Sequence, residues 1–295
     1  MGSINEVQPE TIRTDTADGP LSPRMPWRLS ATAIDRYRLC PRQALWSVTG
    51  VARAQRRDPA LVMGTAVHRA LQKLWGVRPE LRSEAVAHRC LRSVWRRAVG
   101  DAFESREAEG FYGETALAML TSFCSVFDTT GRAVACERSV KARLPNGVEI
   151  YGRVDRVDPS HPGDYREVGG CMVMPRAIDV IDYKTGRYII DSLDLPDESA
   201  AQVYLVAAGA QFNRPVRRVR YVYVAAGVES RWEPEDEDVE AVRSGLIRIT
   251  SAMVADRVFE PAPGDHCARC EFAHLCPEAG RVELDQLEVP DGLGF

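Results

Sequence analysis

The chain has 295 residues, a formal net charge of −4, 45% hydrophobic residues and 27% charged residues. This composition is typical of a globular protein that buries one large core or two modest ones. No stretch approaches the roughly 18 consecutive apolar residues of a membrane span, and the polar start lacks the apolar segment of a signal peptide. The sequence therefore predicts a folded cytoplasmic protein and argues against a membrane-spanning or secreted one.

Positive charge is concentrated near the start of the chain. Between residues 24 and 57 the only acidic residue is Asp35, whereas acidic residues gather at 233–240 and in the C-terminal tail. The arginines of this basic stripe are Arg24, Arg28, Arg36, Arg38, Arg42, Arg53, Arg56 and Arg57. Such a stripe fits either a track for nucleic-acid phosphates or a solvated helix face, and charge alone does not separate the two.

The chain begins with a segment that resembles a disordered arm. Residues 1–26 lack hydrophobic periodicity and contain several prolines. The fold is expected to start at Trp27, and Ser30 or Thr32 can cap a helix that runs to Leu39. Pro41 follows Cys40 directly, so Cys40 is expected at a helix end.

Residues 27–130 are predicted to form a helical part that carries Cys40 and His68. Gly64 is expected to open a helix in which His68 lies beside an apolar stripe. Apolar residues at helical spacing predict two further helices, over 85–98 and 117–127.

The pattern changes to strands in residues 131–258, which are predicted to hold the core sheet. Two strands, 133–144 and 148–157, are joined by Pro145-Asn146-Gly147, and Asn-Gly is a strong hairpin signal. Residues 158–171 predict a loop or loose hairpin extension. The remaining elements are expected to be strands at 177–183 and 218–224 and helices at 198–212 and 235–256.

Chemically informative residues fall on two of these strands. Asp182 and Lys184 in IDYKTG are two residues apart on a strand, so their side chains share a face. Asp155 in GRVDRVD is an acid inside a hydrophobic strand, where it needs a partner if buried. Together they could hold Mg²⁺ or Mn²⁺ and hydrolyse a phosphodiester, with Lys184 acting on the attacking water. His68 would add a nitrogen ligand, which favours Mn²⁺.

Several stretches in this order resemble the RecB-like branch of the PD-(D/E)XK nucleases, which includes the AddB and CRISPR-adaptation exonucleases. The matching segments are SATAIDRYRLCP, GTAVHRAL, GRVDRVD, IDYKTG and CARCEFAHLCP. The resemblance implies an α/β fold with a mixed central sheet flanked by helices, a helical N-terminal part and a C-terminal cysteine segment that closes onto it.

The resemblance also implies roles for individual residues. His68, Asp155 and Asp182 would be the ligands of Mg²⁺ or Mn²⁺, Lys184 the catalytic lysine, and Gln202 a catalytic residue on the following helix. One position departs from the family: it often has a tyrosine four residues after the glutamine, whereas this chain has Val206 there and Tyr204 nearby. The 158–179 insertion is longer than expected. It fits a surface loop better than a segment that shapes substrate access.

A second metal site is predicted from four of the eight cysteines. Cys267, Cys270 and Cys276 lie in the segment 259–280, ahead of a C-terminal tail at 281–295, and Cys40 can supply a distant fourth thiolate. The spacing fits zinc as well as an iron–sulfur cluster. The resemblance to AddB-type enzymes implies a [4Fe-4S] cluster, with His266 and His274 outside the ligand set. The site would tie the two ends of the chain together.

The leading functional hypothesis is a metal-dependent DNA nuclease, an exonuclease on single-stranded or frayed ends, in repair, recombination or defence. The alternative is a non-catalytic DNA-binding or scaffold subunit of a helicase–nuclease or CRISPR adaptation complex. The sequence has no G-x4-G-K-[S/T] phosphate loop. Any unwinding is therefore expected from a separate helicase or defence subunit.

Overall fold

The computed structural model describes residues 24–51, 58–99 and 102–279. Its first part is helical, with α1 (Ala31–Leu39), α2 (Pro41–Val48), α3 (Pro59–Trp75), α4 (Glu84–Val99) and α5 (Arg106–Val126). Later come α6 (Ser199–Phe212) and α7 (Asp236–Ala255). The strands are β1 (Arg28–Ser30), β2 (Ala135–Arg143), β3 (Glu149–Pro159), β4 (Arg166–Val168), β5 (Cys171–Val173), β6 (Ile178–Lys184), β7 (Val216–Tyr223) and β8 (Val228–Trp232).

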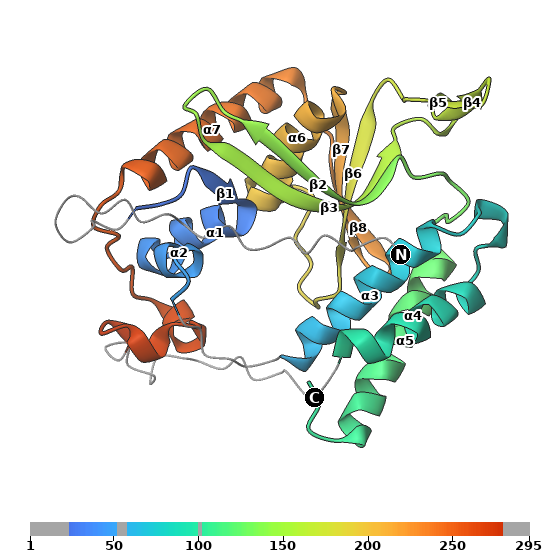
Figure 1. The fold of residues 1–295 in the computed structure, drawn as a ribbon, viewed down its shortest axis with the longest axis horizontal. Coiled ribbons are helices and arrows are strands. Elements are labelled where there is room, and N and C mark those ends of the chain that lie inside the picture. The colour runs from blue at the N-terminus through green and yellow to red at the C-terminus, as the bar shows by residue number, and fades with distance from the viewer. Residues whose placement is uncertain (1–23, 52–57, 100–101, 280–295) are drawn as a thin grey trace, which may run out of the picture.

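A six-stranded mixed sheet lies at the centre of the molecule (Figure 1). The strand order is β1-β3-β6-β7-β8, with β2 also paired to β3. The β1–β3 and β6–β7 pairs are parallel, and the β2–β3, β3–β6 and β7–β8 pairs are antiparallel. The predicted mixed central sheet flanked by helices is confirmed.

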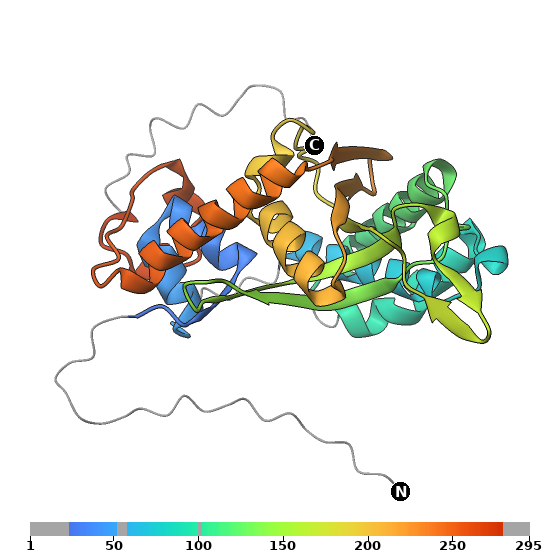
Figure 2. The ribbon, with the colours of Figure 1, turned by 90° about the horizontal axis from the view of Figure 1, so that it is seen from above.

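Each face of the sheet packs against its own set of helices (Figures 1 and 2). Helix α6 packs on β2, β3 and β7 and contacts α1 and α7, and Val180 of β6 belongs to this core. The helices α3, α4 and α5 pack on one another, and their core includes Ile181 and Tyr183 of the same strand. Since alternate residues of a strand face opposite sides, Asp182 faces the α6 side.

The hairpin between β2 and β3 follows the predicted turn. Their antiparallel pairing is confirmed, and Gly147 has a φ of +86°, a conformation that glycine adopts without strain. The predicted loop at 158–171 contains β4, which pairs with β5 as a small separate hairpin with Gly169 and Gly170 at its tip. In Figure 1 this hairpin projects from the body of the molecule.

Two predicted helix starts were wrong. Helix α3 begins at Pro59 rather than Gly64, because Asp58 caps it by accepting a 2.8 Å hydrogen bond from the Ala60 amide, with Pro59 at the first helical position. Helix α5 begins at Arg106 rather than at residue 117, with Ser105 as its cap. By contrast, the predicted cap at Ser30 is confirmed by its 3.2 Å bond from the Ala33 amide.

The C-terminal part of the described chain packs beside α1 and α2 (Figure 1). Arg36 forms a 2.7 Å ion pair with Glu271, and the rings of Trp46 and Phe272 lie edge to face at 5.7 Å. The closure of the cysteine segment onto the N-terminal helices is therefore confirmed. Met25 is also buried, while residues 1–23 of the expected arm and the whole tail, 281–295, lie outside the described residues. Within the described ranges, none of the helices has the length and apolar character needed to cross a membrane.

Candidate functional site

Neighbouring strands of the sheet carry the two predicted acids. Asp155 on β3 is 9% exposed and Asp182 on β6 is 8% exposed, so both carboxylates need compensating partners. The backbone amide of Tyr183 donates a 2.7 Å hydrogen bond to Asp155 Oδ2. This bond fixes the carboxylate of one strand to the backbone of the next.

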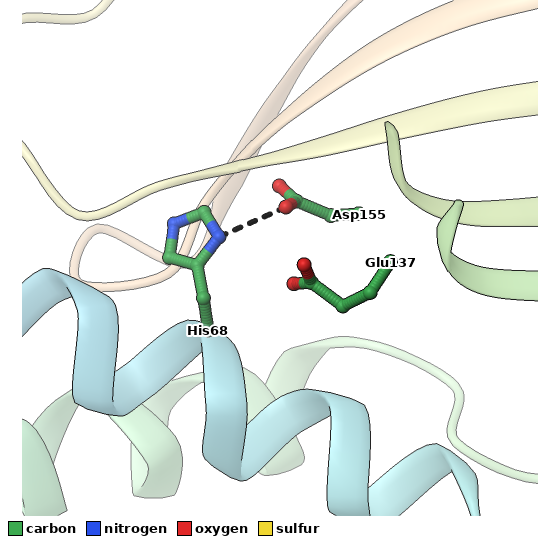
Figure 3. Close-up of side chains that lie close together, drawn as sticks. All are labelled: His68, Glu137 and Asp155. Atoms are coloured by element: carbon green, nitrogen blue, oxygen red, sulfur yellow. Dashed lines mark hydrogen bonds and ion pairs between the residues drawn. The ribbon is translucent and has the colours of Figure 1, made fainter. Parts of the chain in front are cut away.

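Helix α3 places His68 against Asp155. The imidazole Nδ1 lies 3.0 Å from Asp155 Oδ1 (Figure 3). Burial lowers the pKa of His68, but the hydrogen bond and the negative charge of Asp155 outweigh it and the net pKa is raised. Nδ1 is therefore the ring nitrogen placed to bind a cation together with the Asp155 carboxylate.

Glu137 on β2 is a third member of this group, and the sequence analysis missed it. One ligand atom each from His68, Glu137 and Asp155 lie within 4.8 Å of one another, as Figure 3 shows. Burial and then the charge of Asp155 raise the pKa of Glu137, which pairs with Arg153 at 2.7 Å. The backbone of Glu137 has a φ of +50°, a strained conformation for a residue with a side chain.

Asp182 and Lys184 form the pair that the strand spacing predicts. Lys184 Nζ lies 2.7 Å from Asp182 Oδ2 and 4.0 Å from the centre of the Tyr221 ring. Burial raises the pKa of Asp182, and the charge of Lys184 opposes this without cancelling it. Burial lowers the pKa of Lys184, but Asp182 outweighs it, so the pKa is raised and the ammonium form is favoured.

Tyr204 of α6 reaches the other oxygen of Asp182. Its hydroxyl lies 3.0 Å from Asp182 Oδ1 and 3.1 Å from the Arg153 carbonyl. Gly152 makes this approach possible, because a Cβ at that position would lie 2.8 Å from Tyr204 Cε1. The tyrosine that looked displaced in the sequence therefore contacts the predicted acid.

The Gln202 side chain is hydrogen-bonded to residues other than Asp155 and Asp182. Among the described residues, its side chain accepts a 3.1 Å hydrogen bond from Arg38 Nη2 and donates one of 2.8 Å to the Pro196 carbonyl. The structure thus groups His68, Glu137 and Asp155, places Asp182 and Lys184 beside them through Tyr183, and leaves Gln202 at the α1–α6 contact.

The four predicted cysteines line a common cavity with Trp46 and His266 as neighbours. Cys40 and Cys267 are buried, and Cys270 and Cys276 are half-buried. Burial and then the charges of the other three thiols raise the pKa of Cys270, with a backbone hydrogen bond opposing. Yet within the described residues no three cysteine sulfurs lie as close as 4.8 Å to one another.

The basic stripe is largely used in contacts within the protein. Arg28 pairs with Glu149 at 2.9 Å, and Arg38 donates to Ser199 at 2.8 Å. Arg42 donates to the Phe259 carbonyl at 3.2 Å, and Arg36 is paired as described above. Arg53, Arg56 and Arg57 lie outside the described residues. The described arginines therefore mainly hold α1 and α2 in place.

Comparison with known proteins gives a family match over most of the chain. The PD-(D/E)XK nuclease superfamily profile matches residues 28–277. A solved structure named "Putative exonuclease" from Eubacterium rectale is 12% identical, covers 82% of this chain and 86% of its own, and has a TM-score of 0.48. The structure named SSO0001 is 15% identical, covers 87% and 89%, and has a TM-score of 0.37. No curated protein matches this chain.

Proposed function

Because the chain belongs to the PD-(D/E)XK nuclease superfamily, we propose that it is a metal-dependent deoxyribonuclease. The observation that carries this proposal is the cluster of His68, Glu137 and Asp155, whose ligand atoms lie within 4.8 Å of one another. The Asp182–Lys184 pair lies next to this cluster, since the amide of Tyr183 between them is bonded to Asp155.

The donor set fits a hard divalent cation. Two carboxylates and an imidazole nitrogen are ligands for Mg²⁺ or Mn²⁺, and the imidazole favours Mn²⁺. Burial and then the charge of Asp155 raise the pKa of Glu137, and a bound cation would offset both effects. His68, Glu137 and Asp155 would hold the ion, with Asp182 as the fourth ligand that the family resemblance suggests. When bound, such an ion makes water a stronger nucleophile and stabilises charge on phosphate.

The protein groups around the cluster act by position and charge. The Lys184 ammonium would hydrogen-bond the attacking water and the phosphate oxygens, stabilising the negative charge that develops as the P–O bond breaks. Tyr204 and Lys184 together fix both oxygens of Asp182. Gln202, held by Arg38, would act indirectly by setting the position of α1 against α6.

We propose that the substrate is DNA with a single-stranded or frayed end, and that the protein degrades it as an exonuclease. We also place the chain in the RecB-like branch of the superfamily. A separate helicase or a CRISPR or defence subunit would supply the unwound strand. This assignment rests on the order of GTAVHRAL, GRVDRVD, IDYKTG and the cysteine segment along the chain.

Adding Mn²⁺ to the metal-free protein is expected to start degradation of end-labelled single-stranded DNA, and EDTA is expected to stop it. Calorimetry should detect Mn²⁺ binding to the wild type and weaker binding to Glu137→Gln. Glu167→Gln, on the exposed β4–β5 hairpin, is the matched control and should bind like the wild type. DNA that stays intact at all Mn²⁺ and Mg²⁺ concentrations would contradict the proposed activity.

We also propose that Cys40, Cys267, Cys270 and Cys276 hold a [4Fe-4S] cluster. The four thiols line one cavity, which supports a common metal centre. The resemblance of the cysteine segment CARCEFAHLCP to that of AddB-type enzymes favours the cluster over zinc. The cluster would be structural, since it ties α1 and α2 to the C-terminal segment.

Protein purified without oxygen is expected to be brown and to contain about four irons per chain. Cys40→Ser and Cys276→Ser should lose the iron and the colour and melt at a lower temperature, because the two ends of the chain are no longer joined. Cys90→Ser, a half-buried cysteine on α4 far from the set in sequence, should keep both. Colourless protein with one zinc per chain would overturn this assignment.

A further inference from the structure

We infer that the groove between α3 and α4 binds the phosphodiester backbone of a nucleic-acid strand that passes through the active site. The inference rests on the proposed nuclease function and adds the path of the substrate. The α3–α4 groove has a volume of about 350 Å³ and is lined by Arg69, Gln72, Lys73, Ser93, Val94 and Arg97.

The chemistry of the groove suits phosphates. Its lining contains three cationic side chains, two polar ones and no carboxylate, although the whole chain has a net charge of −4. Within the part of the chain that the structure describes, none of Arg69, Lys73 and Arg97 forms an ion pair, and all three are exposed. Lys73 donates a 2.9 Å bond to Ser93, which is neutral, and so keeps its charge for a ligand.

Helix α3 links the groove to the proposed active site, since it carries both His68 and three of the groove's lining residues. Arg69 directly follows His68 on α3, and Gln72 lies one helical turn further on the same face as His68. At 1.5 Å per residue, Lys73 is roughly 7.5 Å along the helix axis from His68. Because Lys73 is also about 140° around the helix from His68, a strand with a phosphate at His68 would cross the exposed face of α3, past Gln72 and Arg69, to reach the groove.

The neighbouring α4–α5 groove is a weaker candidate. It is lined by Arg92, Arg96 and Arg106, but also by Glu109 and Glu114. Carboxylates repel phosphates, so mixed charge does not favour a nucleic-acid backbone. The charged residues that line the α3–α4 groove are all positive. We therefore propose this groove, and not the α4–α5 groove, as the binding site for the backbone.

The test is the salt dependence of binding to a labelled single-stranded oligonucleotide, followed by fluorescence anisotropy in EDTA so that the strand stays intact. Each phosphate contact to a single strand contributes about 0.7 to the slope of log K against log salt. Lys73→Gln combined with Arg97→Gln is expected to lower the slope by about 1.4, equally for different sequences. Lys73→Arg combined with Arg97→Lys, which keeps both charges, should retain the slope.

Arg166→Gln combined with Arg176→Gln is the matched control, because it removes two exposed arginines from the region of the β4–β5 hairpin. It should leave the slope unchanged, and thermal unfolding should show that all variants are folded. If the slope of the Lys73/Arg97 variant is unchanged and the wild-type protein still degrades DNA, the α3–α4 groove does not bind the strand, but the proposed nuclease function is supported. Wild-type protein that neither binds nor degrades DNA would overturn both.

Discussion

Lys184→Met is expected to lose about 10²–10³-fold in DNA cleavage rate, the loss typical of removing one preorganised charge from an active site. Lys184 Nζ is the ammonium bonded at 2.7 Å to Asp182, beside the His68–Glu137–Asp155 cluster. Methionine has similar length and can still pack against the Tyr221 ring, but it cannot donate to water or phosphate. The measurement is single-turnover degradation of end-labelled DNA at saturating Mn²⁺.

Three comparisons separate this catalytic effect from a structural one. Lys141→Met removes an exposed lysine from β2 of the same sheet and should cleave like the wild type. Lys184→Arg keeps the charge but changes its geometry, and should recover part of the rate. Lys184→Met should still bind Mn²⁺, because Lys184 is no metal ligand. If Lys184→Met cleaves DNA at the wild-type rate, Lys184 has no part in the chemistry.

Local signals account for what the sequence predicted well. The Pro145-Asn146-Gly147 turn fixes the β2–β3 hairpin because Gly147 adopts positive φ there. The two-residue spacing of Asp182 and Lys184 places both side chains on one face of β6 whatever surrounds it. Strands β1 and β8, of three and five residues, are too short for an alternating pattern to stand out, and they were missed.

The parts of the site that escaped prediction depend on contacts between distant segments. Glu137 lies on β2 between Cys136 and Arg138, whose partners on β3 flank Asp155. Only the pairing register of the hairpin brings it to the cluster, and its positive φ has no local sequence signal. Tyr204 reaches Asp182 because Gly152, far earlier in the chain, leaves room for its ring. Such contacts follow from tertiary packing.

The cysteine segment was also predicted only in part from the sequence. The close spacing of Cys267, Cys270 and Cys276 predicts a metal site, and the structure does bring these cysteines and Cys40 to one cavity. Sequence spacing left zinc and iron–sulfur open, because both are held by four cysteines. The proposed [4Fe-4S] cluster therefore rests on the resemblance of the segment CARCEFAHLCP to AddB-type enzymes.

On β3, the strand that carries Asp155, the ion pair of Arg156 and Asp158 is expected to control the stability of the fold. Arg156 on β3 is 5% exposed; its Nη2 pairs with Asp158 at 2.8 Å and its Nη1 donates to the Tyr183 hydroxyl at 2.8 Å. Its guanidinium also lies 4.0 Å from the centre of the Trp75 ring. Arg156→Met removes these contacts and leaves the half-buried Asp158 carboxylate without its cation. Breaking a buried pair in this way costs about 3–5 kcal/mol.

Urea unfolding followed by circular dichroism should measure that loss for Arg156→Met. Arg78→Met is the matched control, because Arg78 pairs with Glu80 on the surface at 3.5 Å and exposed pairs contribute about 0–1 kcal/mol. Adding Asp158→Leu to Arg156→Met should restore much of the stability, because it removes the orphaned carboxylate. If Arg156→Met unfolds at the wild-type urea concentration, Arg156 does not control the stability of the fold. If the double variant is no more stable than Arg156→Met, the stability is lost because the contacts with Trp75 and Tyr183 are gone, and not because Asp158 is unpaired.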